Sequence, residues 1–412
     1  MASKPFTLVI VSHVIHYEHE GRLYAYGPYA REIDIWADLF PVVAIAAPLR
    51  RQVPPQDCVP FGRANIEVIP QLETGGDDLS AKLRQLAALP IHVWKLGSAM
   101  ARANAIHVRC PGNLGILGAI LAPLFSKRIV AKYAGDWSGT QYVARSYRLQ
   151  RSILSSRWWR HGVVTVYGQW PDQPPQIVPF FTSMMTASQV REAARSGTAK
   201  SLTLPMQLIY SGRLVPMKGI DVLLRAMRLV RDRNVAMDLT VLGDGPEGKS
   251  LRQLTADLEL GDRVRFKGGI PFDQAMAAYD SAHVLVLASN TEGWPKVIPE
   301  AMCHGLVCVG SDQGLMPWML EDRGYTVKPG DAAALADALV AIASDPVRYQ
   351  ALSRNSLEWA RQYSLEGLRE ALRGLLSRSW NMELPIVGHA PVEEAAVDVP
   401  IEESTANGRN RC

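Results

Sequence analysis

The chain has 412 residues, with 44 lysines and arginines, 40 aspartates and glutamates, and 48% hydrophobic residues. This composition is ordinary for a folded protein and excludes wholesale disorder, a collagen-like repeat and a small disulfide-stapled scaffold. The net charge of +4 is too small to indicate nucleic-acid binding unless the cations cluster locally. At about 150 residues per domain, the length predicts two or three domains.

The five cysteines favour a reducing compartment, because their number is odd and no pair has zinc-site spacing with histidine partners. The first apolar run, residues 8–11, is too short for a signal sequence. The uncharged stretch 110–126 is shorter than the ~20 residues that a bilayer requires, which favours a buried helix. We therefore expect a cytoplasmic protein with free thiols.

The first part of the chain alternates short apolar runs with helical patterns, which predicts an open α/β domain over residues 1–200. Predicted strands lie at residues 6–11, 42–47, 66–69, 105–108, 129–133 and 163–166. Helical patterns cover residues 27–40 and 114–125. The polar and basic stretch 191–203 has no apolar period, so we place the linker between domains there.

The second part is more regular, and residues 201–356 predict another α/β domain. Predicted strands lie at residues 207–211, 238–242, 263–268, 283–287, 306–309 and 325–327. Six strands that alternate with helices predict a parallel, doubly wound sheet, in which ligands bind beyond the carboxyl ends of the strands. Residues 383–412 contain six acidic residues, three prolines and no aromatic residue, which predicts a disordered tail.

The loop after the first of these strands carries two cations, Arg213 and Lys218, between Gly212 and Gly219. Cations beside free backbone N–H groups at the start of a helix suit a diphosphate, although a plain loop with solvated cations is the alternative. After the second strand, Gly243 begins a Gly-Asp-Gly-Pro segment that allows close approach of a ligand or forms a plain turn.

The loop after the fourth strand carries two carboxylates, Glu292 and Glu300, separated by seven residues. Gly293 lets the backbone turn between them, Pro299 suits the first turn of a helix, and Glu300 would face the positive end of that helix. The two carboxylates could approach one ligand. The alternative is one capping and one exposed glutamate.

These pieces, GR-x(4)-KG, GDGP and E-G-x(6)-E, occur in order, each after a strand. Together they resemble the retaining glycosyltransferases of family 4, which have the GT-B fold. The resemblance is strong over residues 206–330 and weaker over the first domain. It implies two Rossmann-like, doubly wound domains facing across a cleft, with residues 357–382 forming a helix that crosses back to the first domain.

The resemblance also implies roles for residues of the second domain. Arg213 and Lys218 would hold the diphosphate of a nucleotide-sugar donor, Glu300 would bind the ribose hydroxyls, and Glu292 would lie against the donor sugar. The other implied donor-binding positions are Gly212, Gly243, Gly268, Gly269, Ile270, Gly293, Trp294 and Val297. Such enzymes do not generally need a metal, and no Asp-x-Asp element follows a strand here, so we expect no metal and no cofactor beyond the donor as co-substrate.

The first domain would supply the acceptor side. Tyr133 stands where many relatives have a histidine, and Asp136 is a catalytic candidate that would orient an acceptor hydroxyl or the donor sugar, or else cap a helix. His13 and His16 follow the first strand and are further acceptor-side candidates, and Gly27 belongs to the counterpart of a glycine-rich first loop.

No acidic residue lies between Asp136 and Asp172, and the segment from Arg145 to Arg160 holds five arginines together with Trp158 and Trp159. A basic segment with tryptophans fits the interface with anionic lipid headgroups. A solvated basic helix with core tryptophans is the alternative. Nucleic acid is not expected, because no recognised motif accompanies the arginines.

We therefore interpret the chain as a metal-independent hexosyl-type transferase at the inner face of the plasma membrane. It would move a sugar, with retention, to a glycan or polyprenyl-linked acceptor in cell-surface polysaccharide or glycolipid biosynthesis. Two alternatives remain open: a nucleotide-sugar epimerase of the same fold, and a catalytically degenerate transferase that serves as a partner subunit.

Overall fold

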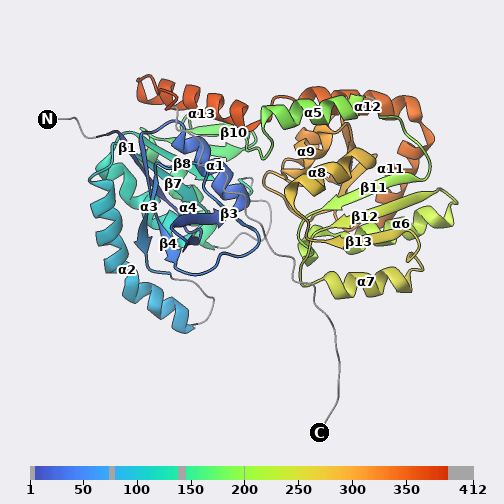
Figure 1. Cartoon of the computed structure of the whole chain (residues 1–412), viewed down its shortest axis with the longest axis horizontal. Helices are drawn as coiled ribbons and strands as arrows, with labels where there is room; N and C mark the ends of the chain where they lie inside the picture. The colour runs from blue at the N-terminus through green and yellow to red at the C-terminus, as the bar shows by residue number, and fades with distance from the viewer. Residues whose placement is uncertain (1–4, 74–78, 138–144, 199, 388–412) are drawn as a thin grey trace, which may run out of the picture.

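The computed structural model describes residues 5–73, 79–137, 145–198 and 200–387, and these form two α/β domains that lie side by side (Figure 1). Each domain is built on its own sheet, as the alternation of strands and helices predicts. No helix of the described residues is long and apolar enough to cross a membrane. The cysteines within this part of the chain are free.

The parallel strands of the first sheet run in the order β6-β4-β1-β7-β8-β9-β10. Their bounds are β1 (Thr7–Val11), β4 (Val42–Arg50), β6 (Ile66–Gln71), β7 (Ala105–Cys110), β8 (Ile129–Tyr133), β9 (Val163–Tyr167) and β10 (Ile177–Phe180). All six predicted strands are confirmed within a few residues. An unpredicted hairpin of β2 (His16–His19) and β3 (Arg22–Tyr26), joined by β5 (Cys58–Pro60), extends the sheet beyond β4.

Helices cover this first sheet. They are α1 (Gly27–Ala37), α2 (Leu79–Met100), α3 (Asn113–Phe125), α4 (Arg145–Ser155) and the single turn η1 (Arg157–Trp159). The stretch 110–126 supplies α3, so the prediction of a helix there is confirmed. In Figure 1, α2 projects beyond the sheet at the lower left.

The second sheet is parallel in the order β13-β12-β11-β14-β15-β16. Its strands are β11 (Met206–Ser211), β12 (Met237–Leu242), β13 (Val264–Gly268), β14 (Val284–Leu287), β15 (Val307–Ser311) and β16 (Gly324–Val327). Its helices are α6 (Ile220–Asp232), α7 (Gly248–Asp257), α8 (Phe272–Ser281), α9 (Val297–Cys303), α10 (Met316–Leu320) and α11 (Ala332–Ser344), with the turn η2 (Pro216–Lys218) before α6. This strand order is that of a doubly wound sheet, as predicted.

Strand order reverses between β11 and β14 in the second sheet and between β1 and β7 in the first. In a doubly wound sheet, the loops that leave the strands at this point diverge and open a crevice. The loops after β11 and β14 are those with the candidate donor-binding residues. The fold therefore brings together segments that lie about 80 residues apart in the sequence.

Two segments differ from the predictions, one between the domains and one near the end of the chain. The stretch 191–203 was expected to be a linker, but α5 (Ala187–Thr198) is a helix that packs against α8, α9 and α12. A single helix was expected over 357–382, but α12 (Pro346–Ala360) and α13 (Leu365–Trp380) are separate. The Ser364 side chain accepts a hydrogen bond from the Gly367 N–H and so caps the start of α13.

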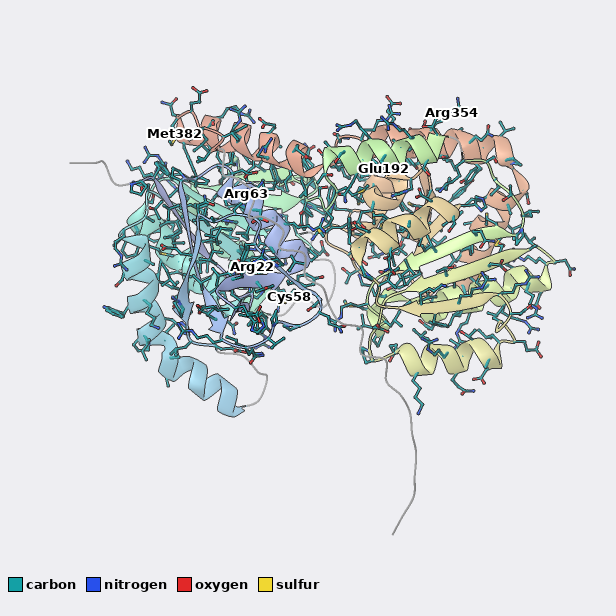
Figure 2. All side chains as sticks on the ribbon, in the orientation of Figure 1. Arg22, Cys58, Arg63, Glu192, Arg354 and Met382 are labelled. Carbon is teal, nitrogen blue, oxygen red and sulfur yellow. The ribbon has the colours of Figure 1, made fainter. Side chains whose placement is uncertain are left out.

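Helix α13 lies over the first domain, whereas α12 and α5 lie over the second (Figure 1). In Figure 2, Met382 marks the end of α13 above the first domain and Arg354 marks α12 above the second. Leu372, Leu376 and Trp380 join the core of the first domain. Leu384 is buried there too, so the predicted tail begins with ordered residues, and its part from residue 388 on lies outside the described residues.

Candidate active site

The loops after β11 and β14 are held against each other. Gly219, which precedes α6, has a φ of +64°, and a Cβ there would stand 2.1 Å from the Ala288 carbonyl oxygen. The Asn290 N–H donates to the Met217 carbonyl at 2.8 Å. Only glycine can occupy the position of Gly219 without strain, so the last glycine of GR-x(4)-KG fixes where the E-G-x(6)-E motif lies.

This contact brings Lys218 to Glu292. The Lys218 ammonium lies 2.5 Å from Glu292 Oε1, and both side chains are largely buried. Arg213, one turn earlier, is exposed, and the Tyr210 hydroxyl donates to its carbonyl oxygen at 2.9 Å. The structure therefore joins three of the predicted catalytic residues at one edge of the sheet, with the Arg213 guanidinium free to face a ligand.

Glu300 occupies the first turn of α9, as predicted, with 8% of its surface exposed. Burial raises the pKa of its carboxyl to about 7, although the charges of Lys296 and Arg31 act in the opposite direction. No hydrogen bond to the Glu300 side chain is found among the described residues. The carboxyl group is therefore held in a desolvated place with its oxygens available to a ligand.

The loops after β12 and β13 complete the edge. The Gly243 N–H donates to the Gly268 carbonyl at 2.7 Å, and the Gly269 N–H donates to the Asp244 carboxylate at 2.6 Å. A Cβ at Gly243 would lie 1.9 Å from the Gly212 carbonyl oxygen. The predicted glycines thus let four loops pack tightly, and Ile270 follows them at the start of the next turn.

The first domain closes over this edge. A Cβ at Gly293 would lie 3.3 Å from the Gly135 carbonyl carbon and 3.5 Å from the Tyr167 ring, so the loop with Glu292 touches the segment that carries Asp136. Tyr26 approaches from β3. Burial raises the pKa of its hydroxyl, and the charges of Arg213 and Glu300 act on it. The sequence did not single out Tyr26.

Other predicted residues serve packing. The Trp294 ring lies in an aromatic cluster with Tyr167, 5.9 Å away between centroids, and with Tyr363, 5.3 Å away. Val297 begins α9 and is half-buried.

The acceptor-side candidates are divided between core and surface. His16 is fully buried between Tyr29 and Phe61, and burial lowers its pKa to about 4. Tyr133 is also buried, edge-on to Trp137. His13 is exposed beside Gly112, and Gly27 begins α1 with its N–H bonded to the Asp57 carbonyl. Of these candidates, His13 is the side chain best placed to reach a ligand.

Sequence reasoning missed a buried group of charges at the same junction. Glu32 on α1 lies 2.6 Å from the Arg109 guanidinium and 2.7 Å from the Lys132 ammonium. Burial alone would raise the pKa of Glu32, but these two cations lower it below its ordinary value. A signal was present, because Lys132 stands inside an otherwise apolar strand and charged residues are almost never fully buried without a partner.

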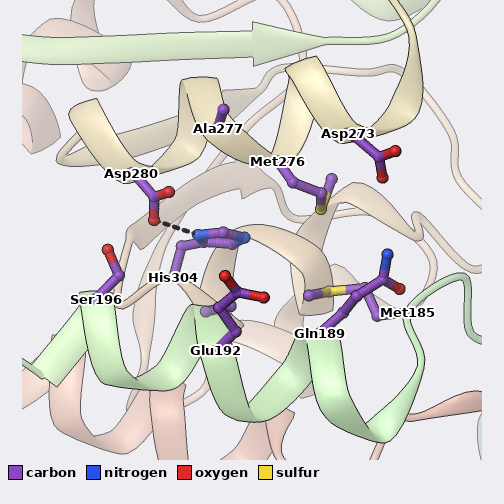
Figure 3. Close-up of a pocket in the computed structure, with 10 residues that line it drawn as sticks. Met185, Gln189, Glu192, Ser196, Asp273, Met276, Ala277, Asp280 and His304 are labelled. Carbon is purple, nitrogen blue, oxygen red and sulfur yellow. Dashed lines mark hydrogen bonds and ion pairs between the residues drawn. The ribbon is translucent and has the colours of Figure 1, made fainter.

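A pocket of about 410 Å³ lies elsewhere, between α5 and α8 (Figure 3). Figure 3 shows Glu192 of α5 pointing toward His304, whose Nδ1 lies 2.8 Å from Asp280 of α8. None of the candidate donor-binding residues lines this pocket. Among the described residues, no group of three or more His, Cys, Asp or Glu could hold a metal ion.

Comparison with known proteins identifies relatives of the second domain. Residues 199–359 match the family model for glycosyl transferases group 1. The chain is 33% identical over 150 residues to the putative colanic acid biosynthesis glycosyltransferase WcaL of Escherichia coli (strain K12), covering 34% of this chain and 37% of WcaL. It is 28% identical over 188 residues to the amylovoran biosynthesis glycosyltransferase AmsK of Erwinia amylovora, covering 42% and 46%. These matches span less than half the length of either relative.

Solved structures extend the likeness to both domains. The sucrose-phosphate synthase from Thermosynechococcus elongatus superposes with a TM-score of 0.66 at 21% identity, covering 91% of this chain and 99% of that one. HepE from Anabaena, solved in complex with UDP, superposes with a TM-score of 0.63 at 18% identity, covering 90% and 100%. These neighbours are GT-B proteins, and the predicted fold is confirmed.

Proposed function

We propose that this protein is a retaining, metal-independent glycosyltransferase of family 4. It would move a hexosyl group from a nucleoside diphosphate sugar to a glycan or polyprenyl-linked acceptor in the assembly of cell-surface polysaccharide or glycolipid. The observation that carries this proposal is the junction of Arg213, the Lys218–Glu292 pair and Glu300 where the strand order of the second sheet reverses. Ligands of doubly wound sheets bind at that place.

The arrangement suits transfer of an activated sugar. Breaking the anomeric C–O bond places negative charge on the departing diphosphate, and Arg213 and Lys218 offer it fixed positive charge. Glu292 orients the Lys218 ammonium through their ion pair. The Glu300 carboxylate, once ionised, can accept hydrogen bonds from both ribose hydroxyls. Gly135 from the first domain approaches the loop of Glu292 from the opposite side of the junction.

A thermal-shift screen of the full chain against nucleoside diphosphates and their sugars tests the donor. A ligand at 100 times its dissociation constant should add about 2.7 kcal/mol of stability. The same addition should be absent in Lys218→Met. Failure of every nucleotide to stabilise the wild-type chain would instead favour a degenerate partner subunit.

The epimerase alternative is tested with the stabilising donor alone. An isomerised donor that forms without an acceptor would replace the transferase proposal. A transferase gives only slow hydrolysis under these conditions. Activity that persists in EDTA would support the absence of a metal requirement.

We further propose that the first domain rests on an anionic membrane at the cytoplasmic face. Trp159 is buried, but Trp158 is 46% exposed, and its indole N–H donates to the Ile120 carbonyl of α3. Leu124 and Phe125 of α3 are exposed, and Phe125 reaches Gly97 of α2. Exposed apolar side chains thus continue from η1 across α3 to α2, where Trp94 is 70% exposed.

Cations border this surface. Four arginines of the segment from Arg145 to Arg160 are exposed: Arg145, Arg148, Arg157 and Arg160. Apolar side chains bordered by cations are the pattern of proteins that lie in the headgroup region of anionic lipid. Co-sedimentation with vesicles that contain phosphatidylglycerol, and its loss at high salt, tests the contact. Equal binding to purely zwitterionic vesicles would contradict it.

A further inference from the structure

The charged group at the junction of the domains contains more cations than one carboxylate can neutralise. Glu32 contacts both Arg109 and Lys132. Lys296 comes from the second domain, in the loop between Glu292 and α9. A Cβ at Gly293 of this loop would lie 3.5 Å from the Tyr167 ring, and the Lys132 ammonium lies 5.5 Å from the centre of the same ring, so the loop packs against the cluster. The charges of Glu32, Lys132, Glu300 and Arg109 act on Lys296. Arg109, Lys132 and Lys296 therefore outnumber the two carboxylates of this place, Glu32 and Glu300.

These cations have unequal partners. Lys132 is 5% exposed and points its ammonium at Glu32 from 2.7 Å. Arg109 uses one guanidinium nitrogen for Glu32 and lies 4.8 Å from the centre of the Tyr29 ring. Lys296 is half-buried, and within the described part of the chain its ammonium makes no hydrogen bond or ion pair. Arg109 and Lys296 are thus the pair left to meet a further anion.

Burial of unbalanced charge is costly, and burial lowers the pKa of the Lys296 ammonium to about 8. His16 does not add charge at neutral pH, because burial lowers its pKa to about 4. Arg31 adds a further cation beside Glu300. The surplus of positive charge therefore lies where the two domains meet.

We infer that Arg109 and Lys296 bind an anionic group of the acceptor, a carboxylate or a phosphate borne by the saccharide that receives the sugar. This inference rests on the proposed function, since it needs a donor held by Arg213 and Lys218. Arg109 supplies a planar donor fork that fits either group, and Lys296 supplies a point charge from the loop next to Glu292. The group binds only when both domains face each other, because each contributes one cation.

The test uses the full chain saturated with the nucleoside diphosphate that stabilises it best, so that the donor cations are occupied. Three probes are titrated by calorimetry: methyl glucuronide, glucose phosphate and the neutral methyl glucoside. At least one anionic probe should bind about tenfold more tightly than the neutral one. Tighter binding of methyl glucuronide identifies the anionic group as a carboxylate, and tighter binding of glucose phosphate identifies it as a phosphate.

Lys296→Met should weaken that probe about tenfold, Lys296→Arg should restore most of the affinity, and the exposed Lys328→Met is the matched control. The affinity for the nucleoside diphosphate should stay within twofold in Lys296→Arg and Lys328→Met. In Lys296→Met its loss should stay well below tenfold, because removal of this charge also raises the pKa of Glu300. Equal binding of charged and neutral probes, or no effect of Lys296→Met, would overturn the inference. A tenfold loss of nucleotide affinity in Lys296→Met would also overturn it, because the cation would then serve the donor.

If no nucleotide binds the wild-type chain, the proposed function fails. The probes titrated alone then still decide whether Arg109 and Lys296 bind anions.

Discussion

Glutamine at position 300 should make the protein more stable at neutral and alkaline pH while it weakens nucleotide binding. Glu300 is almost completely buried, and burial raises its pKa from 4.5 to about 7. Below pH 4.5 the carboxyl is protonated in both the folded and the unfolded chain and contributes no pH dependence. Between pH 4.5 and 7 the unfolded chain loses this proton and the folded chain keeps it, so the free energy of unfolding falls as the pH rises.

The magnitude follows from the two pKa values. Each pKa unit corresponds to about 1.4 kcal/mol, so the folded protein should lose about 3 kcal/mol by pH 8 relative to a residue that does not ionise. Glu300→Gln keeps the size and hydrogen-bonding shape of the side chain but cannot ionise. The difference in free energy of unfolding between Glu300→Gln and wild type should therefore grow by about 2.5 kcal/mol from pH 5 to pH 8, since a small part is already present at pH 5.

Urea unfolding of both proteins at several pH values measures this difference. The fixed effect of the glutamine amide is present at every pH and cancels from the slope. Titration with the nucleoside diphosphate on the same samples should show wild-type affinity falling below pH 7, where Glu300 becomes protonated, and weak, pH-independent binding by Glu300→Gln. A difference in stability that stays constant from pH 5 to pH 8 would refute the proposed burial of an ionisable carboxyl.

Lys218→Met should reduce transfer about 10²–10³-fold in steady-state assays, because a cation that stabilises the departing diphosphate is lost, while circular dichroism stays that of the wild type. Gly243→Ala should lower the urea midpoint by an amount equivalent to about 2 kcal/mol or more, since its φ is +124° and the new Cβ would collide with the Gly212 carbonyl; an unchanged midpoint would contradict the packing described. Glu32→Gln should cost about 3–5 kcal/mol in thermal or urea unfolding, because it leaves Lys132 and Arg109 buried without their carboxylate. A loss of less than about 1 kcal/mol, the usual contribution of an exposed ion pair, would contradict the burial of Glu32, Arg109 and Lys132.

The sequence predicts most of the second domain because each strand there is a short apolar run followed by glycine or a polar turn. The helix face of Ile220, Leu223 and Leu224 is buried as the period of the pattern requires. The positions of Arg213, Lys218 and Glu300 could also be predicted, since each motif directly follows a strand of a parallel sheet. The ion pair between Lys218 and Glu292 could not, because it depends on the contact of Gly219 with Ala288.

The first domain was less predictable for physical reasons. The β2–β3 hairpin is short and half-buried, so its pattern lacks a clean alternation. Histidine does not reveal from sequence whether it packs in a core or faces a ligand, and His16 proved to be core. The sequence predicts a linker where α5 lies. Only Val190, Ala193 and Gly197 of this helix face the interior, and they are too few and too small to give a clear helical period of apolar residues.

The chain passes between the domains at two neighbouring places. The Ser183 hydroxyl donates to the Tyr363 carbonyl at 2.8 Å, and the Leu365 N–H donates to the Met185 carbonyl at 2.8 Å. These two hydrogen bonds join the two connecting segments. We expect the joined segments to act as a hinge that permits rotation of one domain away from the other but resists translation of one domain past the other. Such a swing would part Gly293 from Gly135, whereas the contact between Trp294 and Tyr363 would persist because both rings belong to the core of the second domain. Opening and closing of the cleft would then follow the same rotation each time a ligand enters or leaves.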